Sequence, residues 1–380
     1  MWNAEPALQR TKHGVTMGSN PDVMVLGAGV VGLSTARRLA AGGLSVTVLD
    51  PSSPGGRGSR AAAGVAVPSI RLFENPRMLA FAQAGEVTLQ AELAELGVEL
   101  RRGRGVMRLA LDERIREALA ALHARFPGPL GEWVDATGLA RLEPALEGTP
   151  ALGAYVTSGG FMVDTEAYLQ ALLAQARARG VQLLLGQSAL RVEEHPGSVR
   201  VWTEGGLLET GTLVVAAGAW SGTVPGLEPL PVVPLRGQML TVRAPGFSLQ
   251  HVLSGAMYLA PWRAGEIVVG ATEEKAGFVA AVTPAGLMQL AHTVVKVAPA
   301  LREAQVTGSW AGLRSSTPDG EPLLGRYPRT QRVWVASGHG GQGILTGAET
   351  GAAVAELVQT GKSHWAELFS PARLKQVSEP

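Results

Sequence analysis

The stretch "VMVLGAGVVGLSTARRLAAGGLSVTVLD", residues 23–50, decides the fold of this chain. Two short apolar runs, Val23–Leu26 and Ser45–Leu49, predict strands, and the helical pattern Ser34–Ala41 between them ends at a pair of glycines. A strand, a helix and a second strand in this order form a βαβ unit, whose right-handed crossover makes the two strands parallel. The sequence therefore predicts an α/β fold with a Rossmann-like parallel sheet.

A glycine motif of the GxGxxG type joins the first of these strands to the helix. Gly27 permits the tight turn, Gly29 allows a pyrophosphate to approach the helix N-terminus, and Gly32 allows the helix to pack closely on the sheet. An acid at the end of the second strand can bond ribose hydroxyls and disfavours a 2′-phosphate. The motif thus predicts a dinucleotide site for FAD or NAD, formed by Gly27, Ala28, Gly29, Val30, Val31, Gly32 and Asp50.

Composition narrows the chemistry that the chain can perform. The 380 residues are 46% hydrophobic and 17% charged, which suits a globular protein with more than one core. The net charge of +1 gives no field that would indicate binding to nucleic acid or to an anionic membrane. With no cysteine, the chain has no disulfide, no thiolate chemistry and no thioether-linked cofactor. Histidine is scarce and forms no HExxH pair, so we expect no metal site.

No targeting signal is recognisable in the sequence. Residues 1–20 lack the apolar core of a secretory peptide, so we expect a flexible N-terminal extension, with Met17 as an alternative start. No apolar run reaches the roughly 20 residues that an integral membrane segment needs. We therefore expect a cytoplasmic protein.

The strands change in character along the chain. Parallel-type units lie at the start, near 164–217 and at the end, and alternating, antiparallel-type strands lie between them. This predicts a discontinuous cofactor-binding domain, residues 22–75, 147–225 and 305–365, interleaved with an antiparallel-sheet substrate-binding domain, residues 76–146 and 226–304. An amphipathic helix is expected over Asp164–Gly180, capped by Asp164 or Thr165.

Three further stretches of small residues stand near predicted strand ends. "SRAAAGVAVP", residues 59–68, is either a flexible loop or a backbone that packs against a cofactor, and "LVVAAGAWS", residues 213–221, is typical of the edge of a flavin-binding half. "SGHGGQG", residues 337–343, lies between a strand and a helix and can hold a phosphate, a flat uncharged group or nothing. The candidate cofactor contacts are Arg60, Ala61, Ala62, Ala63, Gly64, Ala217, Gly218, Trp220, Gly338, His339, Gly340, Gly341, Gln342, Gly343 and Ile344.

An ordered set of segments from about residue 23 to 358 carries a more specific signal. They are "VLGAGVVGLSTARRLA", "SRAAAG", "VDTEAYLQAL", "LVVAAGAWS", "PLRGQML", "MYLAPWRAGEIVVGATEE", "AGLRSSTPDGEPLLGR" and "ASGHGGQGI". With them the chain resembles the FAD-dependent D-amino acid oxidase superfamily, and within it the glycine oxidase and sarcosine/D-amino acid oxidase-like branch. The resemblance selects FAD over NAD.

This resemblance implies a reaction as well as a cofactor. It implies oxidative deamination of a small amino acid, of the D-amino acid, glycine or N-methylglycine type, by hydride transfer to flavin N5. The products are an oxo acid, ammonia or an amine, and hydrogen peroxide from O2. We expect non-covalent FAD, because cysteine is absent and no histidine lies near Gly27–Gly32. The glycine loop, with the N-terminus of the following helix Ile344–Gln359, is then expected at the isoalloxazine edge.

Two residues are implied as the catalytic pair. Arg314 matches the family's carboxylate-binding arginine, and a guanidinium fork can grip a carboxylate at two points. Tyr258 matches the family's substrate-binding tyrosine. Without the resemblance, Arg314 would be read as a surface ion pair and Tyr258 as an ordinary strand aromatic. His339 is equally consistent with a packed loop histidine, and Glu273, Glu274 and Lys275 with a solvated strand end.

Two positions depart from the glycine oxidase pattern. Gly341 stands where relatives place a basic residue, and Ala256 stands where a histidine precedes the tyrosine by two positions. The pocket is therefore expected to be roomier and less polar than a strict glycine site, which favours a larger amino acid.

Other functions stay open at this stage. A D-amino acid dehydrogenase would pass electrons to a quinone or carrier instead of O2. A flavoprotein module without amine oxidation and an NAD dehydrogenase are the remaining alternatives. The sequence leaves the exact substrate and its stereochemistry, a homo-oligomeric state and the true start residue undecided.

Overall fold

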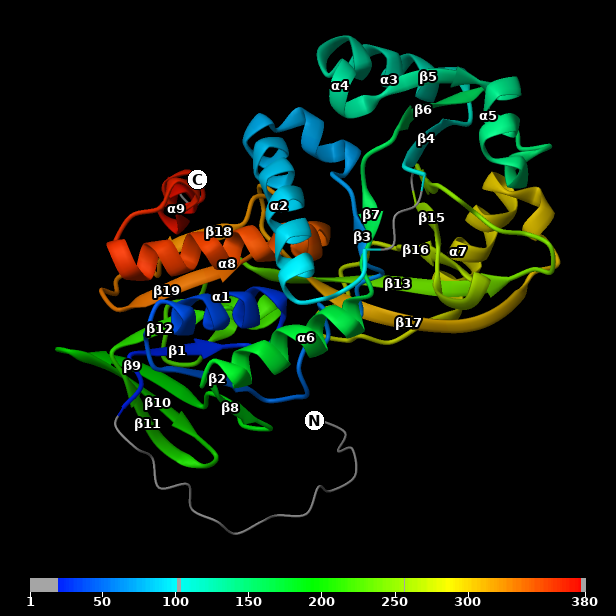
Figure 1. Cartoon of the computed structure of the whole chain (residues 1–380). Helices are drawn as coiled ribbons and strands as arrows, with labels where there is room; N and C mark the ends of the chain where they lie inside the picture. Colours follow the sequence, from blue (N-terminus) through cyan, green and yellow to red (C-terminus); the bar gives the residue numbers. More distant parts are fainter. Residues whose placement is uncertain (1–19, 101–103, 256, 377–380) are drawn as a thin grey trace.

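The computed structural model describes residues 20–100, 104–255 and 257–376. Residues 1–19 of the expected extension, with Met17, and the departure at Ala256 lie outside the described residues. The described chain forms a six-stranded sheet and an eight-stranded sheet that lie beside each other, with helices on both (Figure 1). The predicted α/β class with an additional antiparallel sheet is confirmed.

The six-stranded sheet contains the βαβ unit that opens the chain. Five neighbouring strands run parallel, and one edge strand, β18, runs antiparallel to its neighbour. In spatial order the strands are β18 (Leu323–Arg326), β19 (Val333–Ser337), β12 (Thr212–Val215), β1 (Val23–Leu26), β2 (Val46–Asp50) and β8 (Gln182–Leu185). Three of these strands, β1, β2 and β19, are buried along their whole length and read as continuous apolar runs, as expected for parallel strands covered on both faces.

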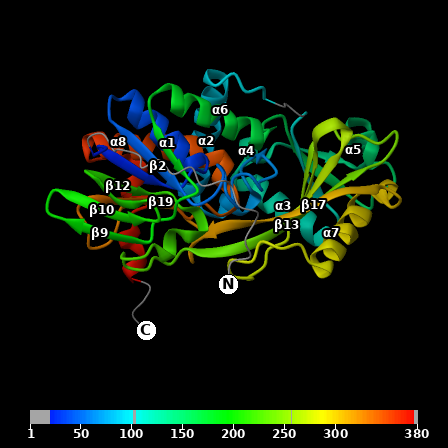
Figure 2. The same cartoon turned by 90° about the horizontal axis from the view of Figure 1, so that it is seen from below.

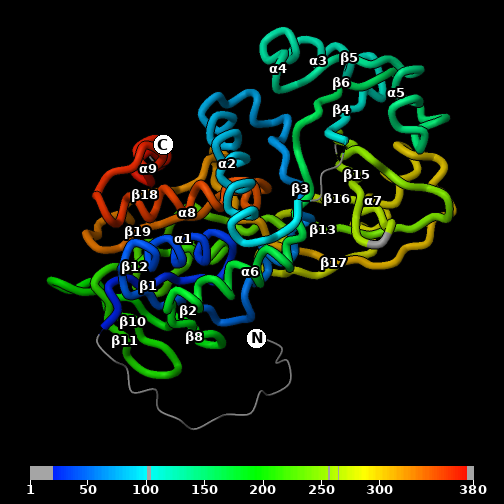
Figure 3. Tube along the Cα trace, viewed as in Figure 1, coloured from blue at the N-terminus to red at the C-terminus, as the bar shows by residue number. Residues whose placement is uncertain are grey.

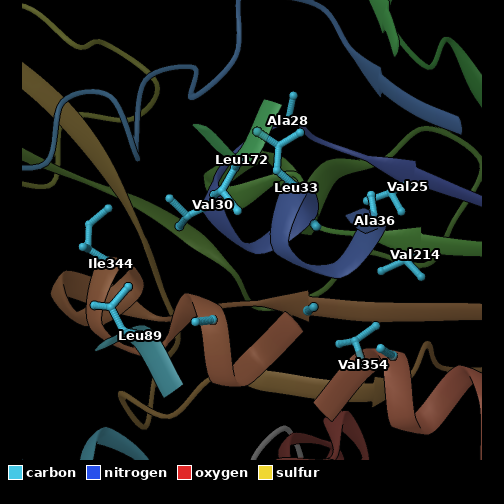
Figure 4. Close-up of a cluster of buried hydrophobic side chains, with 14 of the residues drawn as sticks. Val25, Ala28, Val30, Leu33, Ala36, Leu89, Leu172, Val214, Ile344 and Val354 are labelled. Atoms are coloured by element: carbon cyan, nitrogen blue, oxygen red, sulfur yellow. The ribbon is translucent and has the colours of Figure 1, made fainter. Parts of the chain in front are cut away.

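Helices cover one face of this sheet. They are α1 (Val30–Ala41), α2 (Pro76–Glu95), α6 (Thr165–Ala178), α8 (Gly343–Thr360) and the short α9 (His364–Leu368). Figure 4 shows the shared core, where Val25 of β1 and Leu33 of α1 pack with Leu89, Leu172 and Val354 from three other helices. The helix ends follow local chemistry: Asp164 caps α6 by accepting from the Ala167 N–H, as predicted.

A three-stranded antiparallel sheet covers the opposite face. Its strands are β9 (Arg191–His195), β10 (Ser198–Thr203) and β11 (Gly206–Thr210). Val192 and Val201 pack there against Met24 and Val215 of the parallel sheet.

The eight-stranded sheet is built mainly from antiparallel pairs. In spatial order its strands are β17 (Gln305–Ser316), β13 (Val233–Arg243), β16 (Ile267–Gly270), β15 (Tyr258–Pro261), β14 (Val252–Ser254), β4 (Val106–Ala110), β6 (Gly153–Thr157) and β5 (Glu132–Asp135). Figure 2 shows the two longest strands, β13 and β17, reaching from the α7 side of the molecule toward the six-stranded sheet. The helix α7 (Pro284–Val297) packs on one face.

The opposite face of the eight-stranded sheet looks toward the rest of the molecule. A two-stranded antiparallel sheet, β3 (Val65–Ala66) and β7 (Phe161–Met162), packs against it and lies beside the six-stranded part in the chain trace (Figure 3). At the far end of the sheet are α3 (Glu113–Arg125), α4 (Pro127–Leu130) and α5 (Ala136–Leu142). We call the face covered by this two-stranded sheet the inner face.

Three elements pack elsewhere than the expected division into domains implies. Strands β6 and β17 belong to the eight-stranded sheet, although residues 147–225 and 305–365 were assigned to the cofactor domain. Helix α2 was assigned to the substrate domain, but its apolar side packs in the core of the six-stranded sheet. The place of these elements is decided by pairing with strands and helices far away in the sequence. The local periodicity of the sequence carries no information about such pairing.

In the described part of the chain, no helix is both long enough and apolar enough to cross a membrane.

Candidate functional site

The turn between β1 and α1 has the close contacts that its glycines predict. Gly27 has φ +109°, and a Cβ placed on it would lie 2.4 Å from the Ala216 carbonyl oxygen. A Cβ on Gly32 would lie 1.9 Å from the Gly27 carbonyl oxygen. A Cβ on Gly29 would meet only the Ser59 hydroxyl, at 3.1 Å. Gly27 and Gly32 are thus required by the fold itself, whereas Gly29 leaves room for a ligand at the helix end.

Asp50 has a structural task at the end of β2. Its Oδ2 accepts a hydrogen bond from the Ala28 N–H at 2.7 Å, and its Oδ1 accepts from the N–H and hydroxyl of Ser52, both at 2.8 Å. The carboxylate thereby ties the second strand to the glycine turn. A carboxylate has about four acceptor positions, so the expected bond to a ribose stays compatible with this arrangement.

The segment after β2 bridges the two sheets. The Arg57 carbonyl accepts from the Leu313 N–H at 2.9 Å, and the Ala61 carbonyl accepts from Trp310 Nε1 at 2.9 Å. A Cβ on Gly64, which has φ +76°, would lie 1.9 Å from the Val163 carbonyl oxygen. The run of tiny residues is therefore packed backbone, and the alternative of a flexible loop is not what the structure shows.

The Arg60 side chain differs from its neighbours. It is 41% exposed and pairs with Glu166 of α6, with 3.4 Å between Nε and Oε2. This contact gives its guanidinium a protein partner at the surface, so a contribution to cofactor binding would come from the backbone of this segment.

The other two glycine-rich segments are joined to each other. Strand β12 ends at Val215, and after Ala216 and Ala217 the chain enters a 3-10 turn, Gly218–Thr223, that holds Trp220. The Ser337 hydroxyl, at the end of β19, donates to the Gly218 carbonyl at 2.9 Å. Gly338, with φ +82°, then turns the chain so closely that an added Cβ would lie 2.7 Å from Thr317. The loop thus connects β19 directly to α8, which begins at Gly343 and continues through Ile344.

His339 lies inside this loop. Its Nε2 lies 2.9 Å from the Thr350 hydroxyl on α8, and that hydroxyl donates to the Thr346 carbonyl at 2.8 Å. The ring therefore acts as the donor to Thr350. Burial lowers the pKa of His339 to about 4. The sequence left two interpretations of His339 open, a packed loop histidine or a contact to flavin or substrate. The position of the side chain fits the packed loop histidine.

The low pKa of His339 predicts a pH effect on stability. The unfolded state takes up a proton near the ordinary pKa of 6.5, while the folded state resists protonation down to about pH 4. The stabilisation is thus complete above about pH 6.5 and is lost as the pH falls toward 4. We expect the free energy of unfolding to decrease by up to about 3 kcal/mol over this window. Denaturant titrations of the wild type and of His339→Gln at several pH values check this prediction. The free energy of unfolding of the variant should depend less on pH between about 4 and 6.5.

Arg314 and Tyr258 meet on the inner face of the eight-stranded sheet. Arg314 on β17 donates through Nη1 to the Thr272 carbonyl at 3.0 Å, and its guanidinium lies over Gly237, where a Cβ would be 2.7 Å from Nη2. The Tyr258 hydroxyl lies over Gly270, only 2.5 Å from the position of an added Cβ. Burial raises the pKa of Tyr258 to about 12, although the positive charge of Arg314 opposes the rise. The phenol is therefore a neutral donor beside a guanidinium.

Gly341 brings the glycine loop to the same place. A Cβ on Gly341 would lie 3.7 Å from Arg314 Nε, an ordinary contact, and Gly341 is exposed. The Arg314 side chain thus lies between the inner face and the glycine loop. The structure brings Arg314, Tyr258 and Gly341 into one site, next to the N-terminus of α8.

A group of polar side chains behind Arg314 holds its carbonyl partner in place. Glu274 Oε1 accepts from Thr272 Oγ1 and Gln238 Nε2, both at 2.6 Å, and Oε2 accepts from Arg236 at 2.5 Å. Partial burial acts to raise the pKa of Glu274, but these hydrogen bonds and the charge of Arg236 outweigh it and hold the pKa below its ordinary value. The interpretation of Glu274 as a solvated strand end is wrong, because it fixes the Thr272 that receives Arg314.

Glu274→Gln tests this support. Exchanging the carboxylate for an amide weakens the bonds to Thr272 and Arg236, so Arg314 should be less well oriented. We expect KM for the substrate to rise about fivefold, corresponding to roughly 1 kcal/mol, with a smaller change in kcat. The neighbouring Glu273, which pairs only with the exposed Arg71 at 2.9 Å, offers the matched control. Equal effects of Glu273→Gln and Glu274→Gln on KM would contradict the role of Glu274 in orienting Arg314.

The sequence missed the residues that surround this pair. Gly237, Gly270, Thr272 and Gln238 lie in segments that carry the family resemblance, but none was singled out, because only cross-strand pairing places them beside Arg314 and Tyr258. Within the described residues, no group of three or more His, Cys, Asp or Glu side chains could hold a metal ion.

Comparisons with known proteins agree on one family. A family model described as "FAD dependent oxidoreductase" matches residues 22–357. A glycine oxidase of Bacillus licheniformis is 30% identical over 367 residues, which cover 94% of this chain and 98% of that protein. A solved glycine oxidase structure from Geobacillus kaustophilus has 27% identity and a TM-score of 0.87, covering 93% and 99% of the two chains. A solved iminodiacetate oxidase from Chelativorans sp. BNC1 has 25% identity and a TM-score of 0.81, covering 92% and 98%.

Proposed function

Because the chain belongs to the family of FAD-dependent oxidoreductases, we propose that it is an amino acid oxidase that deaminates a small amino acid and forms hydrogen peroxide. The family assignment makes it a flavoenzyme that acts on amino acid-like substrates. The observation that carries the finer proposal is that Arg314 lies near both Tyr258, whose burial-raised pKa its charge acts to lower, and Gly341 of the glycine loop.

The residues present fit FAD. The open position at Gly29 accommodates a pyrophosphate, which the positive end of the α1 dipole attracts. Gln342 Oε1, in the glycine loop, is buried without a hydrogen-bond partner among the described residues, so a bound group can satisfy this side-chain amide. We propose non-covalent binding through the three glycine-rich segments. When bound, FAD supplies the acceptor for two electrons from the substrate Cα–H bond.

The protein's own residues hold the substrate for this reaction. Arg314 binds the α-carboxylate with its guanidinium fork, and the Tyr258 hydroxyl donates a second hydrogen bond to it. The fixed carboxylate orients Cα toward the glycine loop at Gly341. The substrate, in losing two electrons and two protons, becomes an imine, which water hydrolyses to an oxo acid and ammonia or an amine. No protein base is needed if the amine binds neutral, so the protein contributes orientation and electrostatics.

The substrate of this site is proposed to be larger than glycine. Gly341 adds no side chain beside Arg314, where the pattern of relatives has a basic residue, and it faces solvent. A side chain on the substrate can use this room.

A substrate panel tests the proposal. Purified protein is incubated in air with glycine, sarcosine and pairs of D- and L-amino acids, and both hydrogen peroxide and the oxo acid are measured. The proposal expects the two products in equal amounts from at least one amino acid. Substrate consumption that requires an added quinone or dye would instead show a dehydrogenase. No turnover with either acceptor would remove the proposed activity.

A further inference from the structure

A second arginine is buried on the inner face of the eight-stranded sheet. Arg108, in β4, is 4% exposed. Among the described residues, no carboxylate lies within ion-pair distance of it. Its guanidinium lies 5.6 Å from the centre of the Phe73 ring, and Nη1 makes one long contact of 3.5 Å with the Thr157 hydroxyl. A buried cation with so few partners is unfavourable for the folded protein unless an anion joins it.

Another buried arginine, Arg37, shows the contrast. Arg37, 1% exposed, pairs with Glu92 and Glu95 and also bonds Gln175. Its pKa is raised, because these carboxylates outweigh the effect of burial. The pKa of Arg108 is lowered to about 10 by burial alone. The environment of Arg108 is therefore open to a negative ligand in a way that the environment of Arg37 is not.

Strand register places Arg108 in line with the catalytic pair. Arg108 lies beside Ser254 of β14, which in turn lies opposite Tyr258 of β15. Two strand spacings separate the Cα atoms of Arg108 and Tyr258 by about 10 Å. The intervening Ser254 has a small, half-buried polar side chain. Arg314 reaches Tyr258 from the other side.

Side-chain alternation puts these groups on one face. Val106 packs in the inner-face cluster with Tyr258 and Met162, whereas Met107 and Leu109 pack on the opposite face with α7. Because alternate residues of a strand share a face, Arg108 points to the same side as Val106. Arg314 follows Trp310 of that cluster by four residues and shares the face as well.

We propose that Arg108 binds a second carboxylate and that the preferred substrate is an amino diacid. Arg314 and Tyr258 bind the α-carboxylate of this substrate, and Arg108 binds its distal carboxylate above Ser254. This assignment rests on the proposed amino acid oxidation and names the class of substrate for the same site. The reaction is unchanged, with the imine hydrolysed to an oxo acid that retains the distal carboxylate.

Substrate pairs that differ in one charge test the assignment. We compare D-glutamate with D-glutamine, D-aspartate with D-asparagine, and iminodiacetate with sarcosine. Loss of a charged hydrogen-bond pair corresponds to about a ten- to hundredfold change, so kcat/KM should favour the better diacid by that factor. Arg108→Met should bring the ratio close to one, and Arg108→Lys should restore part of it. Arg116→Met, which removes an exposed arginine of α3 paired with Glu113, is the matched control and should leave the ratio as in the wild type.

Binding without turnover separates this assignment from the proposed activity. Glutarate and butyrate are titrated against the FAD-loaded protein, and the change in flavin absorption gives each Kd. We expect glutarate to bind at least tenfold more tightly in the wild type and equally in Arg108→Met. If glutarate binds in this way but no amino acid is oxidised, the proposed activity is overturned and the anion site at Arg108 stands. Oxidation of amino acids without any preference for diacids, or a preference that survives Arg108→Met, would overturn the anion site and retain the activity.

Discussion

Replacing Arg314 with alanine is expected to lower kcat/KM for the amino acid substrate by about a hundred- to a thousandfold. The guanidinium is the positive partner of the α-carboxylate, and a hydrogen bond to a charged group contributes roughly 1.5–3 kcal/mol. Two such bonds are lost together, and the carboxylate no longer fixes the position of Cα. Steady-state kinetics over a wide substrate range measures the effect, which should appear mainly in KM if binding and the transition state use the contact equally.

Arg314→Lys is the informative companion of this variant. Lysine keeps the charge but lacks the planar fork, so activity should recover only in part. Flavin content and thermal stability of both variants should stay near those of the wild type, because the side chain of Arg314 makes one hydrogen bond within the described residues, to the Thr272 carbonyl at 3.0 Å. Kinetics of Arg314→Ala equal to those of the wild type would show that the carboxylate binds elsewhere.

Gly29→Ala is expected to weaken FAD binding without unfolding the protein. The new methyl group meets only the Ser59 hydroxyl, at 3.1 Å, so the turn itself can accept it. It occupies the space through which a pyrophosphate approaches the start of α1. Overpacking of this kind should weaken the binding free energy of FAD by about 1–3 kcal/mol, which is a five- to 150-fold increase in the Kd for FAD. Titration of the apoprotein with FAD, followed by flavin fluorescence, measures the change.

Whereas Gly29→Ala affects FAD binding, Gly32→Ala, in the same turn, is expected to destabilise the fold itself. Its methyl group would lie 1.9 Å from the Gly27 carbonyl oxygen, so it should destabilise the fold before any ligand is added. We expect low soluble yield and a clearly lowered Tm for Gly32→Ala, but a near-normal Tm for the Gly29→Ala apoprotein. Unchanged FAD affinity in Gly29→Ala would place the pyrophosphate away from this turn. Flavin that stays with the acid-precipitated wild-type protein would contradict non-covalent binding.

Much of the cofactor half could be predicted because its signals are local. The glycines of the first turn, the apolar run Val23–Leu26 and the cap at Asp164 each act within a few residues, and the structure has these elements where they were expected. The start of α1 was placed too late, because its first residues, Val30–Gly32, lie inside the glycine motif.

The division into domains was harder to predict because it depends on partners distant in sequence. Strand β17 precedes the last parallel unit, yet it pairs along its length with β13 in the other sheet. Helix α2 follows a loop that was assigned to the first domain, but its core contacts are with α8, more than 250 residues later. Neither partner can be read from local periodicity.

The candidate site shows the same limit. Arg314 and Tyr258 were found only through the family resemblance, since each alone has a more ordinary interpretation. Glu274 was interpreted only as part of a solvated strand end, and Arg108 was not singled out, because their importance comes from what strand pairing places beside them. An isolated arginine in a strand is unremarkable until its burial and its lack of a carboxylate partner among the described residues are known.

The most direct test of amino acid oxidation is an anaerobic half-reaction followed in the flavin spectrum. The FAD-loaded protein is mixed without O2 with glycine, sarcosine, the D- and L-amino acids and the amino diacids, and the oxidised-flavin band is recorded. The account predicts that at least one of these substrates bleaches the band, that Arg314→Ala slows the bleaching by about a hundredfold or more, and that O2 restores the band with release of peroxide. A band that no amino acid bleaches, in protein that dithionite reduces normally, would contradict it.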